Sequence, residues 1–233
     1  MGRFSRALVL GGTGAVGSAV VRRLLADGTQ VAFTWLKNED RAAELIDAGA
    51  QGHRVQLADA DAVRAFVEDL GGPDLFVHAA VSARQVGIAE TSVEDWNDAV
   101  AVNVRAPFVA IQALLPGFAQ RGGGEVVLSG ALDRGQSLPL PAAFSASQGA
   151  LGAMAMAMAK ELGGMGVRVN VLALGLLTGG LSEALAPELV DAYQRFSALR
   201  RLGTPDEIAG AIVGFAEHNR YVNGKVVPIN GGI

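Results

Sequence analysis

The sequence contains no cysteine, so a disulfide, a thiolate nucleophile and a cysteine ligand for a metal are all excluded. Neither His53 nor His218 has an acidic or histidine partner at ligand spacing, and we expect no metal site. Charged residues are scarce as well, at 18% of the chain with a net charge of −4. Because basic residues form no run longer than the pairs Arg22-Arg23 and Arg200-Arg201, a nucleic-acid partner is not expected.

Long hydrophobic runs are also missing. The longest apolar stretch, Ala150 to Ala159, is far shorter than the roughly 20 residues that a helix needs to cross a bilayer. The first six residues lead directly into the strand-like segment Ala7–Leu10, which leaves no room for a signal peptide. We therefore expect a soluble cytoplasmic protein that has no membrane partner and acts on a small-molecule substrate.

Apolar residues and glycine, by contrast, are abundant, at 50% of the chain and 31 residues. Short apolar runs alternate with longer segments of helical pattern. The expected strands are Ala7–Leu10, Gln30–Thr34, His53–Leu57, Leu75–His78, Glu125–Ser129, Arg168–Ala173 and Lys225–Ile229. The expected helices are Gly14–Asp27, Asp40–Ala48, Ala60–Leu70, Thr91–Gly117 and Phe144–Gly163. This alternation predicts one α/β domain over residues 1–233, a Rossmann-type doubly wound parallel sheet of about seven strands with helices on both faces.

A glycine-rich turn joins the first expected strand to the first helix. Gly11, Gly14 and Gly17 form the pattern G-x-x-G-x-x-G. In a dinucleotide-binding fold such glycines make the tight turn, admit a pyrophosphate close to the backbone, and let the helix pack closely on the strand. The N–H groups at the positive end of the helix then face the phosphates. We expect these three glycines to bind a dinucleotide.

The end of the second strand carries no acidic residue before Glu39. An acid at this point would bind the ribose 2′-hydroxyl of NAD. Lys37 is available there instead for a 2′-phosphate, with Thr13 or Arg41 as its partner. The alternative is that Lys37 is a solvated loop lysine. We expect NADP(H) in preference to NAD, with Thr13 and Lys37 among the cofactor-binding residues.

Further segments, in order along the chain, resemble those of the short-chain dehydrogenase/reductase (SDR) family and of its 3-oxoacyl-ACP reductase-like members. They are Leu57-Ala58-Asp59, the run from Asn103 to Phe108 (NVRAPF), Val167-Arg168-Val169-Asn170, the run from Arg201 to Ala209 (RLGTPDEIA) and Asn230-Gly231-Gly232. The resemblance implies that Asp59 contacts the adenine and that Asn103 belongs to the active site. The glycine turn departs from the family's T-G-x-x-x-G-x-G, because Ala15 stands where the middle glycine would be.

In that family the chemistry belongs to a serine and to a Tyr-x-x-x-Lys pair that begins thirteen residues later. The matching positions here hold Ala131, Phe144 and Gln148, and of the family's four residues only Asn103 is kept. Phenylalanine has no proton to transfer, and glutamine can hydrogen-bond a ribose hydroxyl but has no charge to lower a neighbour's pKa. General acid–base catalysis is worth about 10²–10⁴-fold, so carbonyl reduction by the usual route is expected to be severely impaired.

Two loops that border the nicotinamide in the family also differ: N-N-A-G is replaced by the run His78 to Val81, and P-G by Leu174-Gly175. His78, at the end of the fourth strand, and Ser129, which shares the face of Ala131 if its strand continues, are substitute catalytic candidates beside Asn103. Other side chains expected near or over this centre are Asp133, Ser137, Ser145 and Tyr193. For each candidate the alternative is a structural role.

We weigh three functions. The first is an NADP(H)-dependent oxidoreductase that acts on a carbonyl or polyketide/acyl-like molecule with a non-standard proton donor. The second is a non-redox isomerase, cyclase or dehydratase that reuses the pocket, and the third is a non-catalytic homologue that partners an active SDR subunit. In relatives, the helix that here carries Gly149 and Gly152 forms a subunit interface with its predecessor, so a homo-oligomer, either a dimer or a tetramer, is expected.

Overall fold

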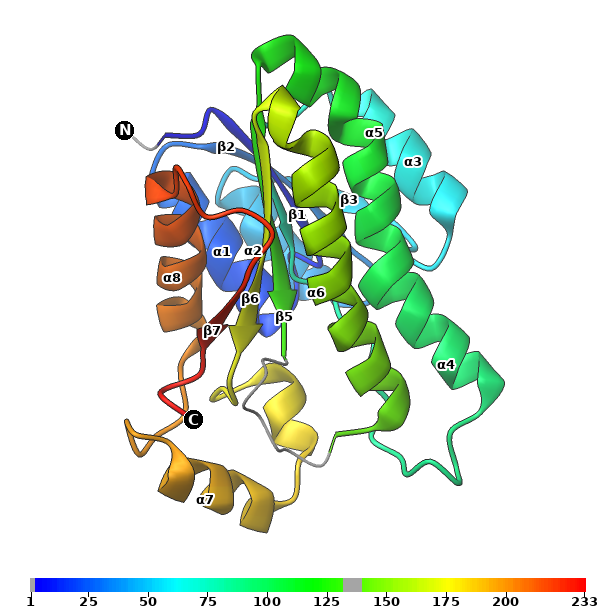
Figure 1. The fold of residues 1–233 in the computed structure, drawn as a ribbon, viewed down its shortest axis with the longest axis vertical. Helices are drawn as coiled ribbons and strands as arrows, with labels where there is room; N and C mark the ends of the chain where they lie inside the picture. Colours follow the sequence, from blue (N-terminus) through cyan, green and yellow to red (C-terminus); the bar gives the residue numbers. More distant parts are fainter. Residues whose placement is uncertain (1–2, 132–139) are drawn as a thin grey trace.

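The computed structural model describes residues 3–131 and 140–233, and within them one parallel sheet forms the centre of the molecule (Figure 1). Its strand order is β3-β2-β1-β4-β5-β6-β7. The strands are β1 (Arg6–Leu10), β2 (Gln30–Trp35), β3 (Gln51–Arg54), β4 (Leu75–His78), β5 (Gly124–Gly130), β6 (Val167–Leu174) and β7 (Val226–Ile229). The strand order reverses between β1 and β4, and open α/β sheets bind ligands outside the carboxyl ends of the strands at such a point. The predicted seven-stranded Rossmann-type fold is confirmed.

Helices cover both faces of this sheet. They are α1 (Ala15–Ala26), α2 (Glu39–Asp47), α3 (Ala60–Asp69), α4 (Val93–Val100), α5 (Ala106–Arg121), α6 (Ala142–Leu162), α7 (Pro187–Phe196) and α8 (Pro205–His218). Figure 1 shows α1, α2 and α8 on one side and α3, α5 and α6 on the other. Successive strand residues point to opposite faces, so Val77 joins the core under α1 and α8, whereas Phe76 joins the core under α5 and α6. Helix α7 lies beyond the carboxyl ends of the strands.

The predicted helix Thr91–Gly117 is two helices joined by a π-helical turn, Ala101–Arg105. Pro107 explains the irregular turn, because it has no N–H to donate to the carbonyl of Asn103 four residues earlier. The predicted strand His53–Leu57 is shifted, since β3 ends at Arg54. Val55 and Leu57 are buried outside the strand, so the apolar pattern alone placed the strand too late in the chain.

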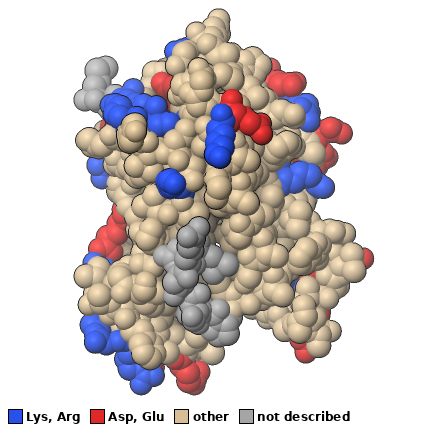
Figure 2. All heavy atoms as spheres, viewed as in Figure 1, with Lys and Arg blue, Asp and Glu red and all other residues tan. Residues whose placement is uncertain are grey.

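The helical stretch Val93–Arg121 is long and apolar enough by composition to cross a membrane, although half of its most apolar window is buried within the domain. One helix of this length and composition is weak evidence for a membrane span, because the core helices of soluble proteins meet the same two criteria. Acidic and basic side chains are interspersed over the face shown in Figure 2. The cytoplasm as the location of the protein stays a prediction.

Candidate functional site

A cavity of about 330 Å³ opens at the carboxyl ends of the central strands. Its walls come from the glycine turn, the ends of β4, β5 and β6, the start of α6, and the segment that leads from β6 towards α7. The described lining residues are Gly14, Ala15, Val16, Ala79, Ala80, Val81, Gln85, Ser129, Gly130, Ala131, Leu140, Phe144, Gln148, Leu174, Gly175, Leu176, Leu177, Gly179, Gly180, Leu181, Ser182 and Leu185. None of these lining residues is ionisable, so the described walls hold no acid, base or charge.

The glycine turn has the geometry that its sequence predicts. Gly11 has a φ of 81°, and a Cβ there would lie 2.5 Å from the Cα of Ala80. A Cβ on Gly17 would collide with the carbonyl of Gly11. Gly14, by contrast, has an extended backbone at the N-cap of α1, where no side chain caps the helix and a Cβ would meet nothing nearer than 3.4 Å. The open helix end is suited to bind an anion such as a pyrophosphate.

The predicted adenine end is solvent-exposed. Asp59 is the N-cap of α3, and its Oδ1 accepts hydrogen bonds from the backbone N–H groups of Asp61 (3.0 Å) and Ala62 (3.1 Å). Lys37 is exposed and makes no hydrogen bond or ion pair with the described residues. Thr13 is half-buried in the glycine turn. These three residues therefore surround the carboxyl ends of β1, β2 and β3 without lining the cavity.

Phe144 and Gln148 lie one turn apart on α6, and both are buried in the cavity wall. The Oε1 of Gln148 accepts a hydrogen bond from the backbone N–H of Ala131 (3.0 Å), which ties the end of β5 to α6. The Nε2 of Gln148 has no partner among the described residues. Gln148 thus lies at the predicted position, but the carbonyl oxygen of its amide is already hydrogen-bonded to the backbone of Ala131.

Ser129 is the penultimate residue of β5, so the strand does continue at this position. The residue contributes to the cavity wall, while its hydroxyl is buried and has no hydrogen-bond partner in the described structure. A buried polar group is normally satisfied by the protein, by water or by a ligand. Ser129 is therefore the candidate whose environment most clearly calls for a ligand.

Asn103 lies in the π-helical turn and is 1% exposed. Its Oδ1 accepts from the backbone N–H of Ser82 (2.7 Å), and its Nδ2 donates to the carbonyl of Ser82 (2.9 Å) and to the hydroxyl of Ser147 (2.9 Å). The Ser147 hydroxyl in turn donates to the carbonyl of Phe144 (2.7 Å). Asn103 therefore joins the loop after β4 to α6, and its side chain does not line the cavity.

His78 does not contribute to the cavity either. It is 1% exposed, and neither ring nitrogen makes a hydrogen bond of acceptable geometry with the described residues. Burial lowers the pKa of His78 to about 3, and an interaction with the backbone of Asn103 opposes this shift only in part. The ring is thus neutral at ordinary pH and is enclosed away from the ligand space. This position does not favour the predicted role of His78 as proton donor. The sequence could not show that the His78 side chain lies beneath the π-helical turn.

The remaining candidates are separated. Ser145 does not line the cavity, and Asp133 and Ser137 lie outside the described residues. Tyr193 is 3% exposed and donates a hydrogen bond to the carbonyl of Asn230 (2.8 Å), which holds α7 against the C-terminal segment. No group of three or more His, Asp or Glu side chains in the described ranges could hold a metal ion.

The sequence did not identify the apolar residues that close the cavity. Leu176, Leu181 and Leu185 come from the segment after β6, and Val81 and Gln85 come from the loop after β4. The general position of the first segment over the site was expected from relatives. Single inward side chains were not predictable, because this segment has neither strand nor helix periodicity before α7.

The sheet order and the glycine turn define a Rossmann-type α/β protein with the features of a dinucleotide-binding fold. Residues 12–233 match the family model described as Enoyl-(Acyl carrier protein) reductase. The chain is 31% identical to the Short-chain dehydrogenase/reductase eriH of Hericium erinaceus, over 97% of this chain and 96% of the relative. The chain therefore belongs to the short-chain dehydrogenase/reductase family.

Two further similarities concern proteins named for what they bind. The chain is 30% identical to the Cyclic-di-GMP-binding biofilm dispersal mediator protein of Escherichia coli (strain K12), over 99% of this chain and 98% of the relative. It also resembles the crystal structure of BdcA in complex with NADPH, with a TM-score of 0.88, 30% identity, and coverage of 98% of this chain and 94% of that one. A nicotinamide cofactor is therefore found in this structural neighbourhood.

Proposed function

We propose that this protein is an NADP(H)-dependent oxidoreductase that acts on an uncharged, largely apolar carbonyl compound without the family's usual acid. The observation that carries the proposal is the cavity wall, in which Phe144 and Gln148 occupy the turn of α6 that matches the family's Tyr-x-x-x-Lys. Because no described lining residue is ionisable, a charged ligand would lose its hydration there without gaining a partner. An uncharged carbonyl compound of polyketide or acyl type would lose little hydration free energy on entering the cavity.

The fit of a dinucleotide rests on the chain's own geometry. Gly14 leaves room at an uncapped helix end for a pyrophosphate, while Gly11 and Gly17 permit the turn that places this helix end beside the cavity. Asp59 precedes α3 and Lys37 follows β2, so both would meet the adenosine end of the dinucleotide. The preference for NADP(H) over NAD follows from the lack of an acid at the end of β2 and from the uncompensated charge of Lys37.

When bound, the dinucleotide would supply the hydride. The residues of the chain would position the carbonyl and exclude water: Phe144 and the leucines of the segment after β6 form a dry wall, and the hydroxyl of Ser129 donates a hydrogen bond to the carbonyl oxygen. The proton that converts the reduced oxygen to a hydroxyl would come from water. A substrate whose carbonyl is already activated suits such a site, because no described residue of the cavity wall is an acid that could assist the reaction.

A second candidate is a dinucleotide- or ligand-binding protein without catalytic activity. The same uncharged cavity favours it, and one relative is named for ligand binding rather than for a reaction. In this case the protein would act alone or beside an active SDR subunit in a mixed oligomer. A non-redox enzyme is less favoured, since isomerisation, cyclisation and dehydration also need an acid or a base.

The first test is titration of the purified protein with NADPH and NADH, followed by assays of NADPH consumption. The carbonyl panel should pair each neutral compound with a carboxylate analogue of similar size. We expect NADPH to bind and only neutral carbonyls to be reduced. Binding without consumption across the panel would support the second candidate, whereas absence of any dinucleotide binding would overturn both dinucleotide-based functions.

A restoration experiment tests the assignment of the α6 positions. The triple variant Ala131→Ser, Phe144→Tyr and Gln148→Lys should gain ordinary ketone reduction if the rest of the site retains the family's geometry. The variant Ala146→Tyr, on an exposed position of α6, is the matched control and should gain nothing. If the triple variant folds and binds NADPH but stays inactive, the altered loops at Ala79 and Leu174 prevent the reaction.

The expected homo-oligomer stays part of this proposal. Trp96 on α4 and Phe108 on α5 are each 44% exposed, and such aromatic side chains on adjoining helices suit a subunit interface. Light scattering of the wild type and of Phe108→Glu is the test. We expect a dimer or tetramer that the charged variant dissociates.

A further inference from the structure

The carboxyl ends of β2 and β3 hold an arginine in a fixed orientation. Trp35 and Arg54 are register partners in this parallel pair of strands, and the guanidinium carbon of Arg54 lies 5.5 Å from the centroid of the Trp35 ring. The Nε of Arg54 also donates a hydrogen bond to the carbonyl of Leu36 (3.2 Å). Stacking limits the tilt of the guanidinium plane, and the hydrogen bond limits its rotation within that plane.

The two terminal nitrogens of Arg54 are available to a ligand. Neither forms a hydrogen bond or an ion pair with any residue in the ranges 3–131 and 140–233, and the residue is exposed. Their planar fork matches two oxygens of a phosphate group. Because the base of the guanidinium is already fixed, little conformational freedom is lost when the fork binds.

This arginine belongs to the same sheet edge as the glycine turn. The backbone N–H of Gly12 donates to the carbonyl of Thr34 (2.8 Å), and that of Val55 donates to the carbonyl of Trp35 (3.0 Å). The end of β2 is therefore in contact with the glycine turn on one side and with β3 on the other. A ligand whose pyrophosphate lies at the glycine turn would pass Arg54 as it extends across the end of β2.

Basic and acidic side chains are mixed around this point. Lys37 and Arg41 follow β2 and Arg54 ends β3, while Glu39 and Asp40 lie on the first turn of α2 and Asp59 precedes α3. Because these charges balance, an anion would be held by the free fork of Arg54 and not by an excess of positive charge.

The indole of Trp35 supports a functional reading of the pair. Its Nε1 is buried and has no hydrogen-bond acceptor in the described structure. Packing and the guanidinium of Arg54 therefore hold the ring in place, while the indole N–H has no acceptor among the described residues. Unsatisfied buried donors are uncommon, and a binding site is one of the settings in which they persist.

We propose that Arg54, oriented by Trp35, binds a phosphate monoester on the ribose 2′-oxygen beside the adenine and so selects the phosphorylated dinucleotide. This inference rests on the proposed function and adds the residue that recognises the extra phosphate. Lys37 contributes charge, whereas Arg54 contributes the two-point geometry. Trp35 is a positioning residue that acts through Arg54.

The test uses adenosine 2′,5′-bisphosphate and adenosine 5′-monophosphate as probes, titrated calorimetrically into the full chain. These probes lack the nicotinamide, so the result does not depend on any reaction in the cavity. The variants are Arg54→Gln, Arg54→Lys and Trp35→Leu. The control is Arg64→Gln, which removes the same charge from a half-buried arginine on α3 whose Nη1 bonds only to Gln112 (3.1 Å).

We expect the wild type to prefer the bisphosphate, and Arg54→Gln to weaken bisphosphate binding by about tenfold to a hundredfold with little change for the monophosphate. Arg54→Lys keeps the charge but loses the fork, so most of this loss should persist. Trp35→Leu should reduce the preference in the same direction, and Arg64→Gln should leave it unchanged. The same ratios are then measured with NADPH and NADH.

Two results would overturn the inference alone: equal binding of both probes by the wild type, or a bisphosphate preference that survives Arg54→Gln in a folded variant. A parallel loss for both probes would also overturn it, because it would place Arg54 against the adenosine and not against the 2′-phosphate. Failure of the wild type to bind any probe or dinucleotide would instead overturn the proposed function on which the inference depends.

Discussion

The side-chain carbonyl of Gln148 accepts a hydrogen bond from the backbone N–H of Ala131 (3.0 Å), and this contact joins α6 to the end of β5 beside the cavity. Replacement by leucine would leave the half-buried N–H of Ala131 without its acceptor. We expect Gln148→Leu to lower the free energy of unfolding by about 1–2 kcal/mol in denaturant titration. Gln120→Leu, on an exposed position of α5, is the control and should change it little. Equal effects would show that the contact contributes nothing specific.

Two serines beside the cavity should respond differently to loss of the hydroxyl. Ser129 has no partner, whereas Ser147 accepts from Asn103 and donates to Phe144. Ser147→Ala should therefore cost about 1–3 kcal/mol of stability, because it leaves one of the two side-chain N–H groups of the buried Asn103 without an acceptor. Ser129→Ala should cost little or even stabilise the protein.

Loss of the Ser129 hydroxyl should affect catalysis although it should hardly affect stability. If Ser129 donates to the substrate carbonyl, Ser129→Ala should lower kcat/KM for neutral carbonyls by about tenfold or more, with NADPH affinity unchanged. Ser145→Ala, at the residue that follows Phe144 on α6 and does not line the cavity, is the control for a lost hydroxyl near the site. An unchanged kcat/KM in Ser129→Ala would rule out this role.

Ser129 and His78 show which features of the site could be predicted from the sequence and which could not. Strand and helix periodicity predicted the sheet and most of the helices, and the resemblance to the SDR family implied that Phe144 and Gln148 lie on one helix face near the site. Which way a side chain points at the end of a strand depends on where the strand ends, and this boundary is poorly fixed by a local pattern. Ser129 consequently lines the cavity, while His78, also at a strand end, is enclosed beneath a helix.

Some missed features did have a local signal. Helix α8 begins with a capping box, in which Thr204 and Glu207 exchange hydrogen bonds, and the spacing Thr-x-x-Glu is visible in the sequence. The Trp35–Arg54 contact had no such signal, because these residues are 19 positions apart and meet only through the register of β2 with β3. Long-range pairs of this kind follow from topology and not from sequence periodicity.

Two glycines of the turn after β1 should separate folding from binding. A Cβ on Gly17 would collide with the backbone of Gly11, so Gly17→Ala should lose about 1–3 kcal/mol of stability or more. A Cβ on Gly14 would lie 3.4 Å from the carbonyl oxygen of Gly11, an ordinary contact distance, and Gly14→Ala should stay within about 1 kcal/mol of the wild type. It should nevertheless weaken NADPH binding by about tenfold, because the methyl group occupies the approach of the pyrophosphate. Wild-type affinity in Gly14→Ala would place the phosphates elsewhere.

The buried neutral ring of His78 predicts an acid-sensitive stability. Burial lowers its pKa to about 3 in the folded protein, from 6.5 in the unfolded chain. Between these values the unfolded state binds the proton more readily, so stability falls as the pH is lowered from 6.5 towards 3. This one group should cost the wild type about 2 kcal/mol at pH 5 relative to neutral pH.

Denaturant titrations of the wild type and of His78→Leu at several pH values test this assignment. Leucine fills a similar volume and binds no proton, so the variant should gain stability relative to the wild type by about 1.4 kcal/mol for each pH unit below 6.5. The gain should stop near pH 3. A difference that does not change with pH would mean that His78 is accessible to protons in the folded state.

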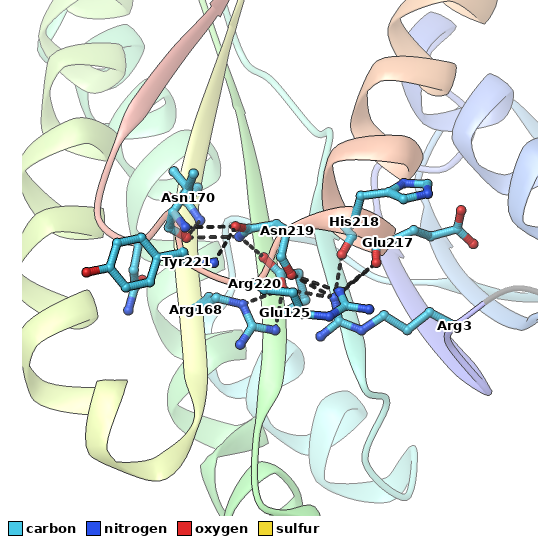
Figure 3. A network of polar contacts seen from close by, with 12 residues as sticks. Arg3, Glu125, Arg168, Asn170, Glu217, His218, Asn219, Arg220 and Tyr221 are labelled. Carbon is cyan, nitrogen blue, oxygen red and sulfur yellow. Dashed lines mark hydrogen bonds and ion pairs between the residues drawn. The ribbon is translucent and has the colours of Figure 1, made fainter.

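Glu125 anchors a polar network at the amino-terminal edge of the sheet, shown in Figure 3. Its fully buried carboxylate accepts from the Nε of Arg168 (2.9 Å) and from the Nδ2 of Asn219 (3.0 Å), and it forms an ion pair with Arg3 (3.6 Å). Burial nevertheless raises the pKa of Glu125, so these partners do not fully compensate the loss of hydration.

Two substitutions of Glu125 should therefore differ in their cost. Glu125→Gln keeps an acceptor for Arg168 and removes the buried charge, and we expect a modest loss of stability. Glu125→Ala leaves Arg168 without its carboxylate and should cost about 3–5 kcal/mol. Since the network lies at the edge of the sheet opposite the cavity, NADPH affinity of the folded fraction should be unchanged in both variants. Denaturant titration measures the first effect and calorimetry the second. Equal losses in the two variants would show that the charge of Glu125, and not its hydrogen-bond acceptor alone, holds the network together.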